Sequence, residues 1–169
     1  MSEIVNRVAK SPIKSLNLEE IYPREERVGF DLKDFLFQEL ILKEQDFRKS
    51  LKELDWEQYK NKWVAIFCGA DAIVPTWAYM LVASYLQPVA KGFAIGDFED
   101  LELNIVNFLV DSLDLEEFQD RPVVIKGCSS IEIPLYAYGK LVSKLQPISK
   151  TLMFGEPCST VPIYKKPKS

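Results

Sequence analysis

The fold is decided by residues 62–96, which read KWVAIFCGADAIVPTWAYMLVASYLQPVAKGFAIG. The apolar run Trp63–Phe67 is typical of a buried strand, and residues 93–95 form a second short run of the same kind. Pro75 suits the first turn of a helix between them, and Pro88 ends that helix because the residue before a proline disfavours helical backbone. A strand, a helix and a strand within about 30 residues predict a βαβ crossover with parallel strands.

The same pattern occurs a second time further along the chain. Residues 54–97 align without a gap with residues 113–156, and 14 of the 44 aligned positions are identical. The dipeptide Ala-Tyr and the tripeptide Leu-Gln-Pro recur in the same register in both copies. Because only two copies occur, the pattern predicts an internally duplicated βαβ unit within one domain rather than a repeat array.

The remaining segments extend the two copies into a sheet. Residues 28–32 and 35–37 have the pattern of short strands, and residues 16–22 that of an edge strand. Residues 98–113, between the copies, carry apolar side chains at helical spacing. The sequence therefore predicts a single α/β domain over residues 1–169, with an open, mostly parallel sheet of about five strands and helices on both faces.

The composition restricts the classes of protein to which the chain can belong. Its 169 residues suit one domain with a sizeable core, and a formal net charge of -4 argues against a broad nucleic-acid surface. The chain starts without an apolar signal segment, and its most apolar stretch, residues 73–86, is too short to span a bilayer. These features predict a cytoplasmic protein that binds neither nucleic acid nor membrane and whose thiols stay reduced.

The absence of histidine excludes a large group of catalytic sites. Ser-His-Asp and Cys-His relays, imidazole metal ligands and histidine general bases all require that side chain. Any chemistry must therefore depend on carboxylates, lysine, tyrosine, thiolates or a bound cofactor. Whether the chain is an enzyme stays open, and a binding or accessory protein is the favoured interpretation.

All three cysteines follow predicted strands. Cys68 and Cys128 come after the first strand of each copy, and Cys158 comes after the last predicted strand. Functional groups gather beyond the carboxyl ends of strands in open α/β sheets, so we expect these thiolates to meet Asp71 and Glu156 there. Such ligands would hold zinc, iron or an iron–sulfur cluster. Small buried residues that fill tight space beside glycine explain the same cysteines equally well.

Two further interpretations stay open. A single nucleophilic thiol, Cys128 or Cys158, stands beside hydroxyls and backbone donors, which suits a sulfur-handling enzyme. Alternatively, the chain is a non-catalytic interaction domain. In that case the helix residues Tyr79 and Tyr138, which recur at equivalent positions, form a self-association face, and the protein is a homodimer.

Several stretches of the chain resemble a known family. They are MSEIVNRV at residues 1–8, DAIVPTWAYM at 71–80, VIKGC at 124–128 and GEPCSTVP at 155–162. Together they are similar, over essentially the whole chain, to a bacterial family catalogued as a domain of unknown function (family 2480). That family brings no established activity. The resemblance implies a link to iron–sulfur assembly proteins as partners, and this link favours thiolate chemistry.

Overall fold

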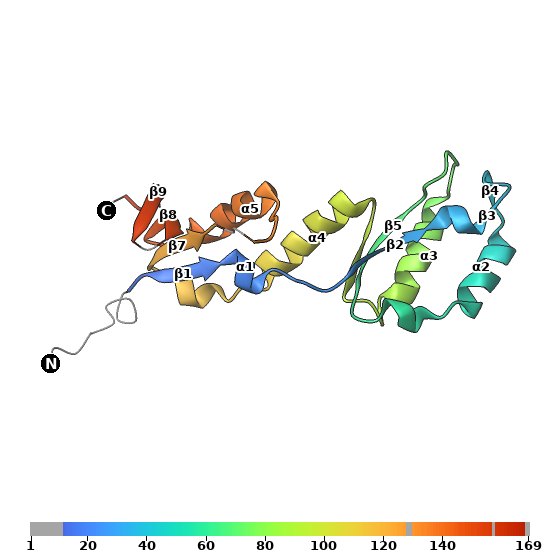
Figure 1. The fold of residues 1–169 in the computed structure, drawn as a ribbon, viewed down its shortest axis with the longest axis horizontal. Coiled ribbons are helices and arrows are strands. Elements are labelled where there is room, and N and C mark those ends of the chain that lie inside the picture. The colour runs from blue at the N-terminus through green and yellow to red at the C-terminus, as the bar shows by residue number, and fades with distance from the viewer. Residues whose placement is uncertain (1–11, 128–129, 157, 168–169) are drawn as a thin grey trace. The chain divides into compact units, whose positions relative to one another are not determined.

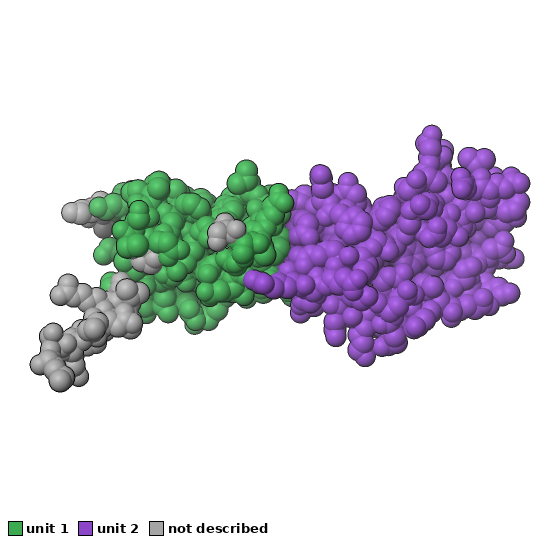
Figure 2. Space-filling view, viewed as in Figure 1, with its two compact units in different colours: residues 1–22, 106–169 green, residues 23–105 purple. Residues whose placement is uncertain are grey.

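The computed structural model describes residues 12–127, 130–156 and 158–167. The chain forms two compact units, which Figure 2 shows in different colours. Unit 1 consists of residues 1–22 and 106–169, and unit 2 consists of residues 23–105. Unit 2 is therefore inserted between two parts of unit 1, and each unit is described by itself below.

Unit 2 contains a parallel three-stranded sheet with the order β2-β5-β6. Its strands are β2 (Arg27–Asp31), β5 (Trp63–Phe67) and β6 (Gly92–Ile95). The predicted crossover is present here, because α3 (Thr76–Leu86) connects β5 to the neighbouring parallel strand β6 (Figure 1). The helix starts directly after Pro75, as its missing N–H allows, and ends just before Gln87 and Pro88.

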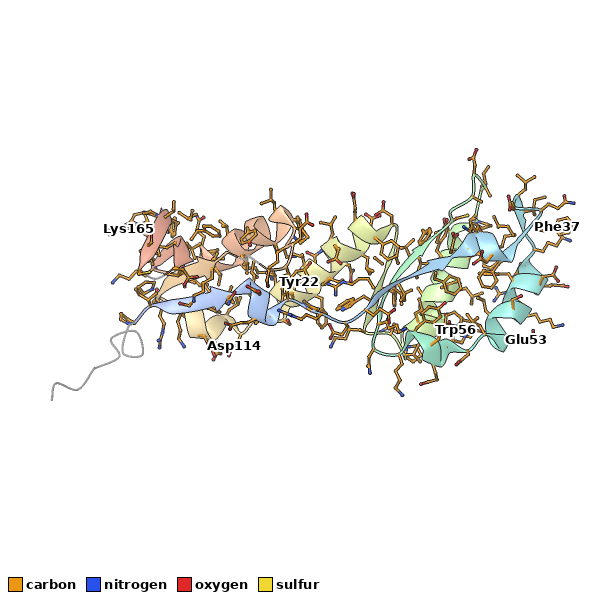
Figure 3. All side chains as sticks on the ribbon, viewed as in Figure 1. Tyr22, Phe37, Glu53, Trp56, Asp114 and Lys165 are labelled. Carbon is orange, nitrogen blue, oxygen red and sulfur yellow. The ribbon has the colours of Figure 1, made fainter. Side chains whose placement is uncertain are left out.

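One face of this sheet carries the core of unit 2. Side chains alternate along a strand, so Val64 and Ile66 of β5 point to the same face as Phe30 of β2. They pack against α3 and against α2 (Glu44–Glu53), which contributes the buried Phe47 and Leu51. Trp56, labelled in Figure 3 near the end of α2, donates its indole N–H to the Leu51 carbonyl at 2.7 Å. Full burial of each such apolar side chain stabilises the unit by about 2 kcal/mol.

On the opposite face of the β2-β5-β6 sheet, glycines leave space for the aromatic rings of neighbouring residues. A Cβ at Gly29 would lie 2.9 Å from the Phe67 ring, and a Cβ at Gly92 would collide with the Trp63 ring. The first half of α4 (Phe98–Asp111) packs on this face, where Phe98 contacts the Phe67 ring. Helices therefore cover both faces of the sheet in unit 2.

Unit 1 contains a four-stranded mixed sheet with the order β1-β7-β8-β9. Its strands are β1 (Lys14–Asn17), β7 (Pro122–Lys126), β8 (Thr151–Glu156) and β9 (Ser159–Lys165). The first three are parallel, and β9 returns antiparallel to β8. The helix α5 (Leu135–Leu145) connects β7 to β8 and buries Ala137, Leu141 and Leu145.

The remaining elements are short. They are α1 (Leu18–Ile21), three 3₁₀ turns at Leu32–Phe35, Trp56–Tyr59 and Leu115–Phe118, and a hairpin of β3 (Leu36–Phe37) and β4 (Ile41–Leu42). Gly96 and Gly155 stand at the carboxyl ends of β6 and β8 with φ of 146° and 117°. These are backbone conformations that favour glycine.

The structure confirms a mixed α/β fold with parallel strands and corrects two details. The prediction of one open sheet of about five strands is wrong for the described residues, because their strands form sheets of four, three and two strands. The predicted edge strand at residues 16–22 ends at Asn17, whose side chain accepts the Glu19 N–H and starts a helix. The single domain over residues 1–169 stays a prediction. None of the helices in the described part is long and apolar enough to cross a membrane.

Candidate functional site

Two of the predicted site residues belong to unit 2. Cys68 directly follows β5, is partly buried, and its Sγ lies 3.6 Å from the Ala70 carbonyl oxygen, to which it donates. Asp71 is exposed in the loop that follows. This loop leads to α3, as expected from the sequence. The hydrogen bond of the Cys68 thiol is made within the loop and does not reach α3.

The other predicted site residues belong to unit 1. Glu156 ends β8, and its Oε2 lies 3.1 Å from the Lys126 Nζ, so its carboxylate already has a cationic partner. Cys158 is exposed at the turn between β8 and β9. Cys128 lies outside the described residues.

Among residues 12–127, 130–156 and 158–167, no group of three or more cysteine, aspartate or glutamate side chains is arranged to hold a metal ion. The predicted ligands come from both units, two from unit 2 and three from unit 1. The thiolate site built from Cys68, Cys128, Cys158, Asp71 and Glu156 therefore stays a prediction.

Asp31, which sequence reasoning missed, organises the strand ends of unit 2. Its carboxylate accepts the N–H of Gly69 at 2.8 Å and that of Lys33 at 2.9 Å, and lies 3.3 Å from the Lys33 ammonium. Desolvation raises the pKa of Asp31, but these hydrogen bonds and the Lys33 charge outweigh it and lower the pKa overall. The carboxylate thereby ties the loop after β5 to the end of β2.

Tyr79 lies close to this carboxylate and to the Cys68 thiol. Burial raises the pKa of the Tyr79 phenol, and negative charge at Cys68 and Asp31 raises it further. The side chain is partly buried and packs against the core of unit 2. Tyr79 therefore lies partly buried near the Cys68 and Asp31 side chains.

Unit 1 contains an apolar pocket of about 540 Å³. It opens at the carboxyl ends of β7 and β8, between the sheet, α5 and the loop that connects β7 to α5. Its lining is mostly aliphatic and aromatic: Ile125, Gly127, Ile131, Glu132, Ile133, Leu135, Tyr138, Val142, Phe154 and Ile163. Glu132 is the one ionisable carboxylate among these residues.

The walls of the pocket follow from the local sequence. Tyr138 of α5 meets Phe154 of β8 edge to face, with ring centroids 5.8 Å apart. Ile163 of β9 closes the side beyond β8, so the antiparallel fourth strand is part of the pocket. Leu135, at the start of α5, is 86% exposed at the rim. An apolar pocket of this volume that is open to solvent is typical of a ligand site.

Sequence reasoning identified Tyr138 as a special residue but assigned it to a self-association face. The signal for the pocket was the run Ile131, Ile133 and Leu135 in a segment between a strand and a helix, where polar residues are usual. The strand β9 was not predicted, and without it the pocket has no outer wall.

Comparison with known proteins gives a family but no relative of known activity. No curated protein and no solved structure matches the chain significantly. The model of the family described as "Protein of unknown function (DUF2480)" matches residues 2–166, which is nearly the whole sequence. The chain therefore belongs to the DUF2480 family.

Proposed function

We propose that this chain is a non-catalytic binding protein whose pocket in unit 1 holds a small apolar ligand. The observation that carries the proposal is the pocket itself, about 540 Å³ in volume and lined mostly by aliphatic and aromatic side chains. Pockets for small molecules have volumes of roughly 300–1,000 Å³ and a predominantly apolar lining with few polar groups. The position beyond the carboxyl ends of parallel strands is also where α/β sheets bind ligands.

The charge of the lining restricts the ligand further. Among the lining residues that the structure describes, Glu132 is the only charged one, and no lysine or arginine is present. Bringing an anionic ligand next to this carboxylate would cost electrostatic free energy, whereas an amine would gain it. The rings of Tyr138 and Phe154 are also surfaces that attract cations. The ligand class is therefore a neutral or cationic apolar molecule.

The neutral fluorescent probe N-phenyl-1-naphthylamine tests the pocket, because its emission increases in apolar surroundings. We expect saturable binding of one probe per chain. Val142→Trp fills the pocket and should weaken binding at least tenfold. Met80→Trp is the matched control, because Met80 is 62% exposed on α3 in unit 2 and the same ring is added outside the pocket. Equal affinity of both variants would contradict the proposal.

The anionic probe 8-anilinonaphthalene-1-sulfonate tests the charge of the ligand. We expect it to bind more weakly than the neutral probe, and Glu132→Gln should improve its binding while leaving the neutral probe unchanged. An effect of Glu132→Gln on both probes alike would instead indicate that the variant alters the shape of the pocket.

We also propose that the two units arose by the internal duplication predicted from the sequence. It is supported by the parallel order of three strands in each unit, with a helix between the second and third. Asn61 and Asp120, which align with each other, also share a positive φ, at 58° and 52°. At the aligned positions Gly127 corresponds to Cys68 and Phe154 to Ile95, and no strand of unit 2 corresponds to β9. We infer that one copy acquired the pocket after duplication.

The thiolate-binding function expected from the sequence remains a separate prediction. Elemental analysis of protein purified without oxygen tests it, together with the same measurement on a Cys68→Ser variant. Metal at one equivalent per chain in the wild type and its loss in the variant would support a thiolate site. Metal content below one tenth of an equivalent in the wild type would contradict it.

A further inference from the structure

In the described part of the chain the two larger sheets have four edge strands, and three of these carry residues that discourage a further strand. Lys14 lies in β1, Arg27 and Asp31 lie in β2, and Pro162 and Lys165 lie in β9. Charged residues and proline on an edge are the usual protection against pairing with another chain. The fourth edge, β6, reads Gly-Phe-Ala-Ile and contains neither.

The hydrogen-bonding groups of β6 point to this open edge. The Gly96 N–H, just after β6, is donated to the Ile66 carbonyl of β5. Because successive N–H groups alternate in direction along a strand, that of Ala94 also points to β5, and those of Phe93 and Ile95 point away from it. The Ile95 side chain is 51% exposed. The edge therefore offers backbone donors and an apolar side chain together.

Unit 1 provides an example of an occupied edge. The strand β8 aligns with β6 in the sequence, and its outer edge is covered by the antiparallel strand β9. The described part of unit 2 has no corresponding strand next to β6. An antiparallel strand is thus the form of partner that this kind of edge accepts.

We propose that the partner is a second copy of this chain, whose β6 pairs antiparallel with β6 across a twofold axis. The charges at the two ends of the strand are complementary in that arrangement. Lys91 precedes the strand and Asp97 follows it, and both are exposed. Antiparallel pairing brings the lysine end of one copy to the aspartate end of the other, whereas parallel pairing would bring like charges together.

Both flanking side chains also interact within their own chain. The Lys91 Nζ lies 3.5 Å from Glu25 Oε1 and keeps a side-chain exposure of 38%. The Asp97 carboxylate accepts the N–H groups of Glu99 and Asp100 through one oxygen, Oδ1. A four-residue edge is short, so we expect a dimer that dissociates on dilution rather than a permanent one.

Sedimentation equilibrium of the full chain over a hundredfold range of concentration tests the proposal. We expect the mass to rise from one chain toward two. Ile95→Lys introduces a charge at the edge and should shift the dissociation constant at least tenfold toward monomer. Val161→Lys is the matched control, because Val161 is 60% exposed on the protected edge β9, and it should leave the equilibrium unchanged.

Amide hydrogen exchange gives a second measurement that requires no variant. Exchange at Phe93 and Ile95 should slow as the protein concentration rises, whereas exchange at Gly96, already bonded to β5, should not change. A mass of one chain at every concentration would overturn the proposal. So would a dimer that Ile95→Lys leaves intact, or exchange at Phe93 and Ile95 that is independent of concentration.

Discussion

At the scale of single residues, Asp31 shows how a carboxylate at a strand end can fix two loops. It accepts the backbone N–H of Gly69, in the loop after β5, and that of Lys33, in the turn after β2. A Cβ at Gly69 would come within 2.6 Å of the Asp31 oxygen, so a larger residue there would displace the carboxylate from its present position. The charge, not only the shape, of Asp31 should therefore contribute to stability.

Asp31→Asn tests this contribution, because asparagine keeps an acceptor and removes the charge. We expect the free energy of unfolding at neutral pH to fall by about 2 kcal/mol, the usual range for hydrogen bonds to a charged group. Folding lowers the pKa of Asp31 below its ordinary value of 3.8. The free energy that the charged carboxylate contributes to folding is therefore fully present above pH 3.8, and it is lost as the pH falls through the pKa of the folded state. Urea titrations of both proteins should therefore converge below about pH 4. A constant difference at every pH would show that the charge is irrelevant.

The two described cysteines should differ in reactivity. Cys158 is exposed, whereas Cys68 is partly buried and donates to the Ala70 carbonyl. Alkylation requires access to the sulfur, so Cys158 should react with iodoacetamide several times faster than Cys68 in the folded protein. Peptide mass spectrometry at several reaction times measures both rates. The alkylation rates of both cysteines in urea are the control. Equal rates in the folded protein would contradict the difference in exposure between Cys158 and Cys68.

At the scale of elements, the sequence signals worked where a local rule dominates. The strand β5 was predicted at its observed bounds, and α3 starts after Pro75 and ends before Pro88 as the proline rules require. The residues 16–22 were misread because their apolar spacing suits a strand, whereas the Asn17 side chain caps a helix. The strand β9 was missed because Pro162 within it is atypical of strands and is tolerated only at an edge.

The candidate site was less predictable than the elements. Local patterns placed Cys68 and Glu156 at the ends of strands, as observed. They could not indicate that Lys126 pairs with Glu156, or that Ile163 closes a pocket with Phe154. Those contacts depend on which strands are neighbours, and strand pairing is not encoded in the local spacing of apolar residues.

The hairpin between β3 and β4 stores local strain that can be removed. Gln38 and Glu39 have φ of 53° and 58°, a left-handed conformation that costs non-glycine residues about 1 kcal/mol each. Replacing the pair by Asn-Gly, which favours such turns, should stabilise the hairpin by about 1 kcal/mol. Hydrogen exchange at the Leu40 amide, which is donated to the Phe37 carbonyl, should slow accordingly. Ala-Ala at the same positions is the control and should give no slowing.

At the scale of the whole molecule, the division between the units falls inside α4. Leu101 and Ile105 belong to unit 2, while Val106, Leu109 and Val110 belong to unit 1, and all five are buried. The sequence predicted a single domain because no linker composition interrupts the chain. The continuity of α4 gives a physical reason for cooperative unfolding, since loss of the helix would remove core side chains from both units.

The protein contains a natural probe for this cooperativity. All three tryptophans, Trp56, Trp63 and Trp77, lie in unit 2, so their fluorescence reports the unfolding of that unit. Leu145 of unit 1 and Leu86 of unit 2 occupy aligned positions and are both fully buried. Truncation of either to alanine should cost about 3 kcal/mol. If the chain is one domain, Leu145→Ala lowers the urea midpoint seen by tryptophan fluorescence as much as Leu86→Ala does. If only Leu86→Ala shifts that midpoint, the units unfold independently and the single-domain prediction fails.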